Sequence, residues 1–173
     1  IMLQCSKVMK SIVTNPKPVI AEVAGVATAA GCQLVASCDL AYATKSARFA
    51  TPGVNIGLFC STPMVALSRN VTNKHSMEML LTGSMISSTK AAEIGLINKM
   101  INDDELRMFV LDKALEISKK SSLTLKIGKE AFYKQINLNL SEAYDYASNV
   151  MVENMLKLDA EEGIEAFINK RTP

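Results

Sequence analysis

Residues 18–39 have the composition best suited to chemistry. A short apolar run ends at Gly25, a run of small residues continues to Gly31, and an apolar helix is predicted over 29–38. Small side chains allow another molecule to approach the backbone closely, and the first amides of a helix have no partner within it. Such amides can hold an anion or a developing oxyanion. Close packing of a strand against a helix would explain the same small residues, so both interpretations stand on composition alone.

The other reactive side chains give weaker signals. The cysteines contain no Cys-x-x-Cys pair, and a single histidine, His75, leaves no spacing typical of a zinc site. We therefore predict no metal site. Three cysteines have apolar neighbours, which indicates small packing residues in a reduced, intracellular protein. The four cysteines are Cys5, Cys32, Cys38 and Cys60.

The spacing of hydrophobic residues, together with prolines and glycines that end helices, predicts the helices and strands that position these residues. Apolar residues at helical spacing indicate a first helix, which Pro16 and Pro18 end. Gly83 and Gly95 are typical of left-handed helix ends. The glycines and prolines of residues 52–63 indicate a loop. The predicted helices are 2–13, 29–38, 64–71, 74–81 and 88–94, and the predicted strands are 19–24, 40–43 and 97–101.

Charge divides the chain into two regions. Residues 1–101 carry nine Lys and Arg against four Asp and Glu, whereas residues 102–173 carry ten against thirteen. Three Asx residues in the second region are followed three positions later by Glu, a pattern typical of a helix capping box. The pairs are Asn102 with Glu105, Asn139 with Glu142, and Asp159 with Glu162. We therefore predict an α/β domain over 1–101 and an all-helical region over 102–173.

Length and composition exclude several classes of partner. The 173 residues are 49% hydrophobic and 21% charged, which is typical of a globular chain. The longest apolar runs are far shorter than the ~18 residues of a membrane span. A net charge of +2 and 5% aromatic residues favour no nucleic-acid or membrane partner. The chain begins at Ile1 rather than at a methionine, so we expect it to begin inside a longer polypeptide.

Several segments in order along the chain resemble the enoyl-CoA hydratase/isomerase (crotonase) superfamily. The resemblance implies a crotonase-like spiral of ββα turns, here N-terminally incomplete, followed by an α-helical trimerisation region. It also implies an acyl-CoA thioester as ligand without a separate cofactor, a homotrimer or hexamer, and a mitochondrial role in fatty-acid and lipid metabolism. The matching segments are Lys-Pro-Val-Ile-Ala at 17–21, Ala-Ala-Gly-Cys-Gln-Leu at 29–34, Phe-Ala-Thr-Pro at 49–52, Val-Asn-Ile-Gly-Leu at 54–58, Ala-Ala-Glu-Ile-Gly-Leu-Ile at 91–97 and Glu-Gly-Ile-Glu-Ala-Phe at 162–167.

The resemblance also assigns roles to individual positions. Two backbone amides of the family hold the thioester oxygen, and one of them corresponds to Ala30, beside Gly31, which we expect to contact the ligand. The second amide would precede Ile1. Cys60 and Ser61 stand where the family usually has proline and glycine, so we expect them to line the acyl pocket.

The two glutamates that activate water and protonate the substrate in the hydratases correspond to Gln33 and Gly53. A carboxamide has no useful basicity near neutral pH, and glycine has no side chain. We therefore predict an acyl-CoA-binding protein without ordinary hydratase activity. Two alternatives stay open: an active hydratase- or isomerase-type lyase with substitute residues, in which Gln33 could orient a water, and a pure assembly subunit.

Overall fold

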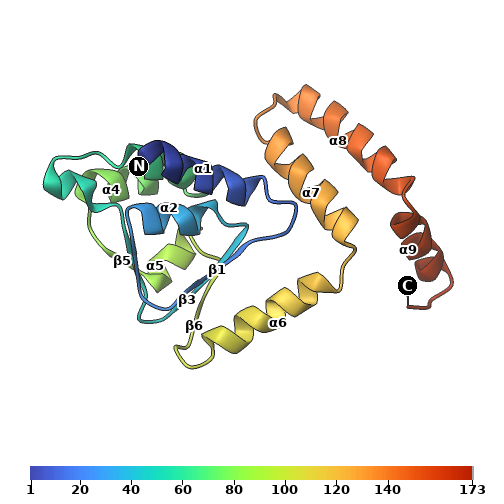
Figure 1. Cartoon of the computed structure of the whole chain (residues 1–173), viewed down its shortest axis with the longest axis horizontal. Coiled ribbons are helices and arrows are strands. Elements are labelled where there is room, and N and C mark those ends of the chain that lie inside the picture. The colour runs from blue at the N-terminus through green and yellow to red at the C-terminus, as the bar shows by residue number, and fades with distance from the viewer. Residues whose placement is uncertain (173) are drawn as a thin grey trace. The chain divides into compact units, whose positions relative to one another are not determined.

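The computed structural model describes residues 1–172 (Figure 1). These residues form two compact units. Unit 1 consists of Ile1–Asn15 and Val19–Leu115, and unit 2 consists of Pro16–Pro18 and the chain from Glu116 onward. The strands lie in unit 1, and unit 2 is helical. Helix α6 (Leu106–Ser118) begins in unit 1 and ends in unit 2.

Unit 1 contains two three-stranded sheets whose strands alternate along the chain. The pairs β1–β3, β3–β6 and β2–β4 are parallel, and β4–β5 is antiparallel. Consecutive strands such as β1 and β2 enter different sheets, so each early turn of the chain adds one strand to each sheet before a helix follows. The first sheet comprises β1 (Ile20–Val23), β3 (Leu40–Thr44) and β6 (Lys99–Ile101), and the second comprises β2 (Val26–Thr28), β4 (Arg48–Ala50) and β5 (Ile86–Ser87).

Helix α2 packs against both α1 and α3, and α1 lies beside it in Figure 1. Cys32, Val35 and Ala36 form the buried face of α2, whereas Ala30 and Gly31 at its start are exposed. The start of α2 is therefore accessible while the rest of the helix is fixed in the core. The helices are α1 (Met2–Val13), α2 (Ala30–Ser37), the 3-10 helix η1 (Pro52–Ile56), α3 (Ser61–Asn70), α4 (Asn73–Thr82) and α5 (Ser88–Glu93).

The main core of unit 1 combines a few large side chains with many small ones. Phe49, Leu67 and Leu80 are at most 1% exposed, and each contributes on the order of 2 kcal/mol by its burial. Alanines such as Ala43 and Ala91 are fully buried between them. Small residues let strands and helices approach closely. Charged residues seldom lie in such a buried interior, which explains why this region carries so little charge.

A second, smaller cluster anchors the start of α6 within unit 1. Leu106 and Val110 are buried with Tyr42 and Ile101 of the first sheet. The ring of Phe109 meets the edge of Tyr42 with centroids 5.0 Å apart. Edge-to-face aromatic pairs of this kind contribute roughly 0.5–1.5 kcal/mol beyond the area that they bury.

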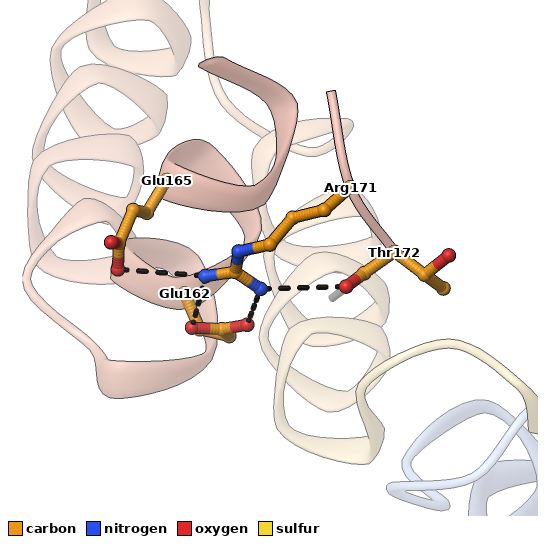
Figure 2. Close-up of polar contacts among 4 residues, drawn as sticks. All are labelled: Glu162, Glu165, Arg171 and Thr172. Carbon is orange, nitrogen blue, oxygen red and sulfur yellow. Dashed lines mark hydrogen bonds and ion pairs between the residues drawn. The ribbon is translucent and has the colours of Figure 1, made fainter. Parts of the chain in front are cut away.

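Unit 2 has almost no interior of its own. It contains α7 (Ser122–Gln135), α8 (Leu140–Met155) and α9 (Leu158–Ile168). Among its described residues only Ala166 is buried. The end of the chain is held instead by polar contacts: Arg171 folds back onto Glu162 and Glu165 of α9 (Figure 2).

The structure confirms most predicted elements and corrects others. The helix over 2–13 has its predicted bounds, and Gly83 and Gly95 have φ angles of 62° and 82°. The predicted loop over 52–63 is wrong in part, because η1 begins at Pro52 and α3 begins at Ser61. Pro63 therefore lies in the first turn of α3, where its missing N–H has no helical partner to lose. The sequence does not predict β2, β4 or β5, which have only two or three residues each and so no readable alternation.

One of the three predicted helix caps is confirmed. The Asn139 side chain accepts a hydrogen bond from the Glu142 amide at 3.0 Å. The side-chain amide of Asn102 instead donates a hydrogen bond to the Glu105 carboxylate at 3.0 Å. It does not cap a helix, because α6 begins only at Leu106. Asp159 lies inside the first turn of α9 rather than before it.

Candidate functional site

The start of α2 is held in an unusual backbone conformation. Ala29, which precedes the helix, has φ 47° and ψ −113°, a region that costs a residue with a side chain about 1–3 kcal/mol. Two hydrogen bonds hold it there: its N–H donates to the Ala50 carbonyl at 3.0 Å, and its carbonyl accepts from the Gln33 amide at 2.9 Å. The exposed residues Ala30 and Gly31 thus present the first amides of α2 at a fixed place.

Gln33 is a buried polar residue one turn into the same helix. It is 4% exposed, and its Oε1 accepts a hydrogen bond from the Cys5 thiol of α1 at 3.7 Å. The carboxamide can donate and accept hydrogen bonds, but it cannot act as a general base near neutral pH.

Gly53 lies in η1, within a loop that closes on itself. Its N–H donates to the Cys60 Sγ at 3.3 Å, and its carbonyl accepts from the Leu58 amide at 2.9 Å. A Cβ at position 53 would lie 2.4 Å from the Leu58 carbonyl oxygen and 2.9 Å from Cys60 Sγ. The φ of Gly53 is not in the left-handed region, so the constraint is one of space. The loop itself fills the volume that any side chain at this position would need.

Cys60 is therefore engaged with the backbone of its own loop. It is 8% exposed and directly precedes α3, whereas its neighbour Ser61 is exposed and donates to the Phe59 carbonyl at 3.3 Å. Burial, with a smaller contribution from Cys60, raises the pKa of the Cys32 thiol to about 12. Cys32 lies on α2, which packs against α3, the helix that Cys60 directly precedes.

The structure places the predicted site residues on two neighbouring segments. Ala30, Gly31 and Gln33 lie together at the start of α2, and Gly53 and Cys60 contact each other in the loop before α3. The sequence does not predict the role of Cys5, which contacts Gln33 from a position 28 residues earlier in the chain. No local pattern could have revealed that contact.

Thr51 is a second residue without a sequence signal. It is fully buried directly after Ala50, and its Oγ1 has no hydrogen-bond partner in the described part of the chain. An enclosed hydroxyl without a partner typically costs about 1–3 kcal/mol. It lies next to the residue that holds Ala29.

The remaining features of unit 1 lie elsewhere. A shallow cavity of about 130 Å³ between α4 and α5 is lined in part by His75, Glu78 and Lys90, and it includes none of the predicted site residues. Within residues 1–172, no group of three or more His, Cys, Asp or Glu side chains could hold a metal ion. None of the helices in the described residues has both the length and the apolar character needed to cross a membrane.

Comparison with known proteins shows close relatives over nearly the whole chain. The human and Xenopus laevis proteins named "Enoyl-CoA hydratase domain-containing protein 3, mitochondrial" are 50% and 51% identical over 169 residues. Those residues are 98% of this chain but only 56% and 58% of the two relatives, so the chain spans little more than half of their length.

Solved structures show the same likeness in three dimensions. The crystal structure of human enoyl Coenzyme A hydratase domain-containing protein 3 matches with a TM-score of 0.97 at 50% identity, covering 99% of this chain and 68% of that one. An enoyl-CoA hydratase from Mycobacterium smegmatis matches with a TM-score of 0.98 at 47% identity, covering 99% and 67%. These matches confirm the predicted crotonase fold with its C-terminal helical region. The sequence profile described as Enoyl-CoA hydratase/isomerase matches residues 2–173, and the chain belongs to that family.

Proposed function

We propose that this chain is part of an acyl-CoA-binding protein of fatty-acid metabolism that lacks ordinary enoyl-CoA hydratase activity. The observation that carries the proposal is the filled space at Gly53, together with the uncharged side chain of Gln33. By family resemblance these are the positions of the two catalytic glutamates. The names of the relatives support a coenzyme A thioester as ligand and a mitochondrial location.

The proposed binding step uses the start of α2. The Ala30 amide would donate to the thioester oxygen, with Gly31 beside it. The constrained backbone of Ala29 supports this role, because a donor held in place before the ligand arrives needs no reorganisation. Cys60 and Ser61, at the start of α3, would border the acyl group.

The chemistry that follows binding would be limited. A positioned general acid or base typically contributes about 10²- to 10⁴-fold to a rate. Neither position supplies one, since Gln33 is a carboxamide and the space at Gly53 is filled. Polarisation of the thioester carbonyl would survive, whereas activation of water and protonation of the α-carbon would not.

Calorimetry of the full-length protein tests the binding step. Butyryl-CoA is compared with S-butyl-CoA, a thioether of the same chain length without the carbonyl oxygen. We expect butyryl-CoA to bind at least several-fold more tightly, because only it can accept the hydrogen bond at Ala30. Equal affinities would contradict the role of the Ala30 amide, and absence of binding by either compound would contradict the proposed function.

The second candidate function is an active lyase that uses substitute residues. The observation in its favour is that Gln33 is a buried carboxamide held by Cys5, a geometry that could orient a water. If the full-length protein turns over an enoyl-CoA, loss of that turnover in Gln33→Ala would support this candidate. Turnover unchanged in Gln33→Ala would remove it.

For assembly, we propose that the C-terminal helices mediate a homotrimer or a hexamer. Large apolar side chains of α8 and α9 are exposed in the single chain, among them Tyr144, Met151 and Phe167. Burial of such side chains against other copies is the usual way to remove them from water. Light scattering should give the mass of a trimer or hexamer, and a monodisperse monomer would refute the assembly.

A further inference from the structure

The Ser121 hydroxyl joins the starts of two helices of unit 2. It accepts a hydrogen bond from the Thr124 amide at 3.0 Å and so caps α7. It also donates a hydrogen bond to the Asp159 carboxylate, which lies in the first turn of α9. A hydroxyl can fill both roles because it has one proton to donate and lone pairs to accept with. We call Ser121 and Asp159 together the α7–α9 latch.

Burial contributes little to holding α9 in place. In α9, which the structure describes completely, only Ala166 is buried, whereas Leu158 and Phe167 are largely exposed. Glu162 pairs with Arg171 a few residues further along, so that contact stays within the C-terminal segment (Figure 2). Helix α8 also packs less against α9 than against α7. Loss of the latch should therefore release α9 while α7 and α8 stay folded.

The residues before the latch form a pattern that a protein kinase can recognise. Lys119 and Lys120 are exposed and directly precede Ser121, in the short turn between α6 and α7. Kinases choose among hydroxyl groups partly by the charges that flank them, and an acidic substrate groove selects serines that follow basic residues. Ser121 is itself partly exposed, so the turn offers both the charges and the hydroxyl.

We propose that Ser121 is a phosphorylation site and that phosphorylation opens the α7–α9 latch. Transfer from ATP forms a bond between Ser121 Oγ and the γ-phosphorus, breaks the bond from that phosphorus to the bridging oxygen, and releases ADP and the hydroxyl proton. The phosphate oxygens can still accept from the Thr124 amide, but the proton donated to Asp159 is lost. The proposal is independent of acyl-CoA binding, because it uses contacts of unit 2 alone.

Charge determines which of the two helices is released. A phosphate carries about −1.5 to −2 at pH 7, and here it would be next to the acidic first turn of α9, which contains Asp159 and Glu161. Lys157, directly before that helix, offers a single positive charge, so repulsion exceeds attraction at α9. The first turn of α7, all of it described, contains no acidic residue, and a negative charge at its start is favourable.

A matched pair of variants of the full-length protein tests the latch. Asparagine and aspartate have nearly the same shape and both cap helices well, but only asparagine can donate to Asp159. Ser121→Asn should leave hydrogen exchange of the α9 amides slow, whereas Ser121→Asp should speed it by about 3- to 10-fold, the net worth of one hydrogen bond. Exchange in α7 should change in neither variant. Adding Asp159→Asn to Ser121→Asp should restore slow exchange, because the new amide can donate in the reverse direction.

Treatment of the full-length protein with ATP and protein kinase C, followed by mass spectrometry, tests the modification. We expect phosphate on Ser121, and we expect it to be lost when Lys119 and Lys120 are both replaced by alanine. Exchange of the α9 amides in the phosphorylated protein should be at least as fast as in Ser121→Asp.

Three results would overturn the proposal, and none of them bears on acyl-CoA binding. Slow α9 exchange in Ser121→Asp would show that the latch does not hold α9. Equal acceleration in α7 and α9 would show that the variant opens unit 2 as a whole. Absence of phosphate from Ser121, including its presence on Ser122 alone, would show that the latch serine is not the modified residue.

Discussion

The start of α2 and the loop before α3 are neighbouring segments that differ in the room each leaves for an acidic side chain. By family resemblance, each carries the position of one hydratase glutamate. At Gln33 the side chain has nearly the size and shape of glutamate, is buried, and is held by Cys5. At Gly53 the loop itself occupies the space that a side chain would need.

The two positions therefore differ in kind: position 33 has room for a carboxylate of the same size, whereas position 53 has no room for any side chain. Exchange of an amide for a carboxylate at 33 changes charge without changing volume. A side chain at 53 must displace a backbone carbonyl and the Cys60 thiol that accepts the Gly53 N–H. We therefore expect a glutamate to be easier to install at position 33 than at position 53.

The largest predicted effect comes from Gly53→Ala, which tests the filled space with a single methyl group. The new Cβ would lie 2.4 Å from the Leu58 carbonyl oxygen, so the loop must move. Overpacking of this kind typically lowers the free energy of unfolding by about 1–3 kcal/mol. Urea denaturation of the full-length protein measures the loss, and Gly53→Glu should lose at least as much.

Gly25→Ala is the matched control for this variant. A Cβ at position 25 would have nothing within 4 Å. We expect the free energy of unfolding to change by no more than about 0.5 kcal/mol. If Gly53→Ala is as mild as Gly25→Ala, the loop yields easily and the contrast between the two positions disappears.

The next effect concerns Cys32, which is fully buried on α2. Burial raises the pKa of its thiol to about 12 from a usual 9.0. The folded protein therefore keeps the proton while the unfolded chain loses it, so stability is complete below pH 9 and falls as the pH rises toward 12. At pH 10 the loss should be on the order of 1.4 kcal/mol.

Comparison with Cys32→Ala isolates this contribution from that of other titrating groups. The variant should be less stable at pH 7 because it leaves a cavity, but its stability should fall less between pH 8 and pH 10. Equal alkaline losses in both proteins would show that Cys32 ionises as readily when folded as when unfolded.

The smallest predicted effect is a gain in stability from Ala29→Gly. Glycine adopts the φ of 47° without the steric cost that alanine bears. Relief of that cost, less the extra entropy of glycine in the unfolded chain, should raise the free energy of unfolding by about 1 kcal/mol or less. Thermal denaturation checks the sign.

Ala114→Gly, on the exposed surface of α6, provides the opposite case. Glycine in an exposed helix costs about 1 kcal/mol relative to alanine. If Ala29→Gly lowers the free energy of unfolding as much as Ala114→Gly does, the backbone before α2 is not strained.

The sequence predicts those features that depend on local order along the chain. The helix over 2–13 follows from apolar spacing and two prolines, and the left-handed ends at Gly83 and Gly95 follow from glycine itself. The identity of Gln33 was sufficient to predict that no strong base stands at that position. These inferences need no knowledge of distant contacts.

The features that the sequence does not predict depend on segments that meet in space. The contact between Cys5 and Gln33 joins two helices, and the filled space at Gly53 depends on how the loop returns at Leu58 and Cys60. The strained φ of Ala29 depends likewise on the Ala50 carbonyl in another strand. Contacts between segments far apart in the chain cannot be predicted from local residue patterns.

Hydration of crotonyl-CoA by the full-length protein tests the central claim most directly, with an active hydratase of the family assayed beside it. We predict that the protein hydrates crotonyl-CoA at least about 10²-fold more slowly than that hydratase, because one general acid or base typically contributes about 10²- to 10⁴-fold to a rate. Gln33→Glu should not restore the rate of the active enzyme, because position 53 still lacks its carboxylate. Turnover by the unmodified protein at the rate of that hydratase would contradict the account.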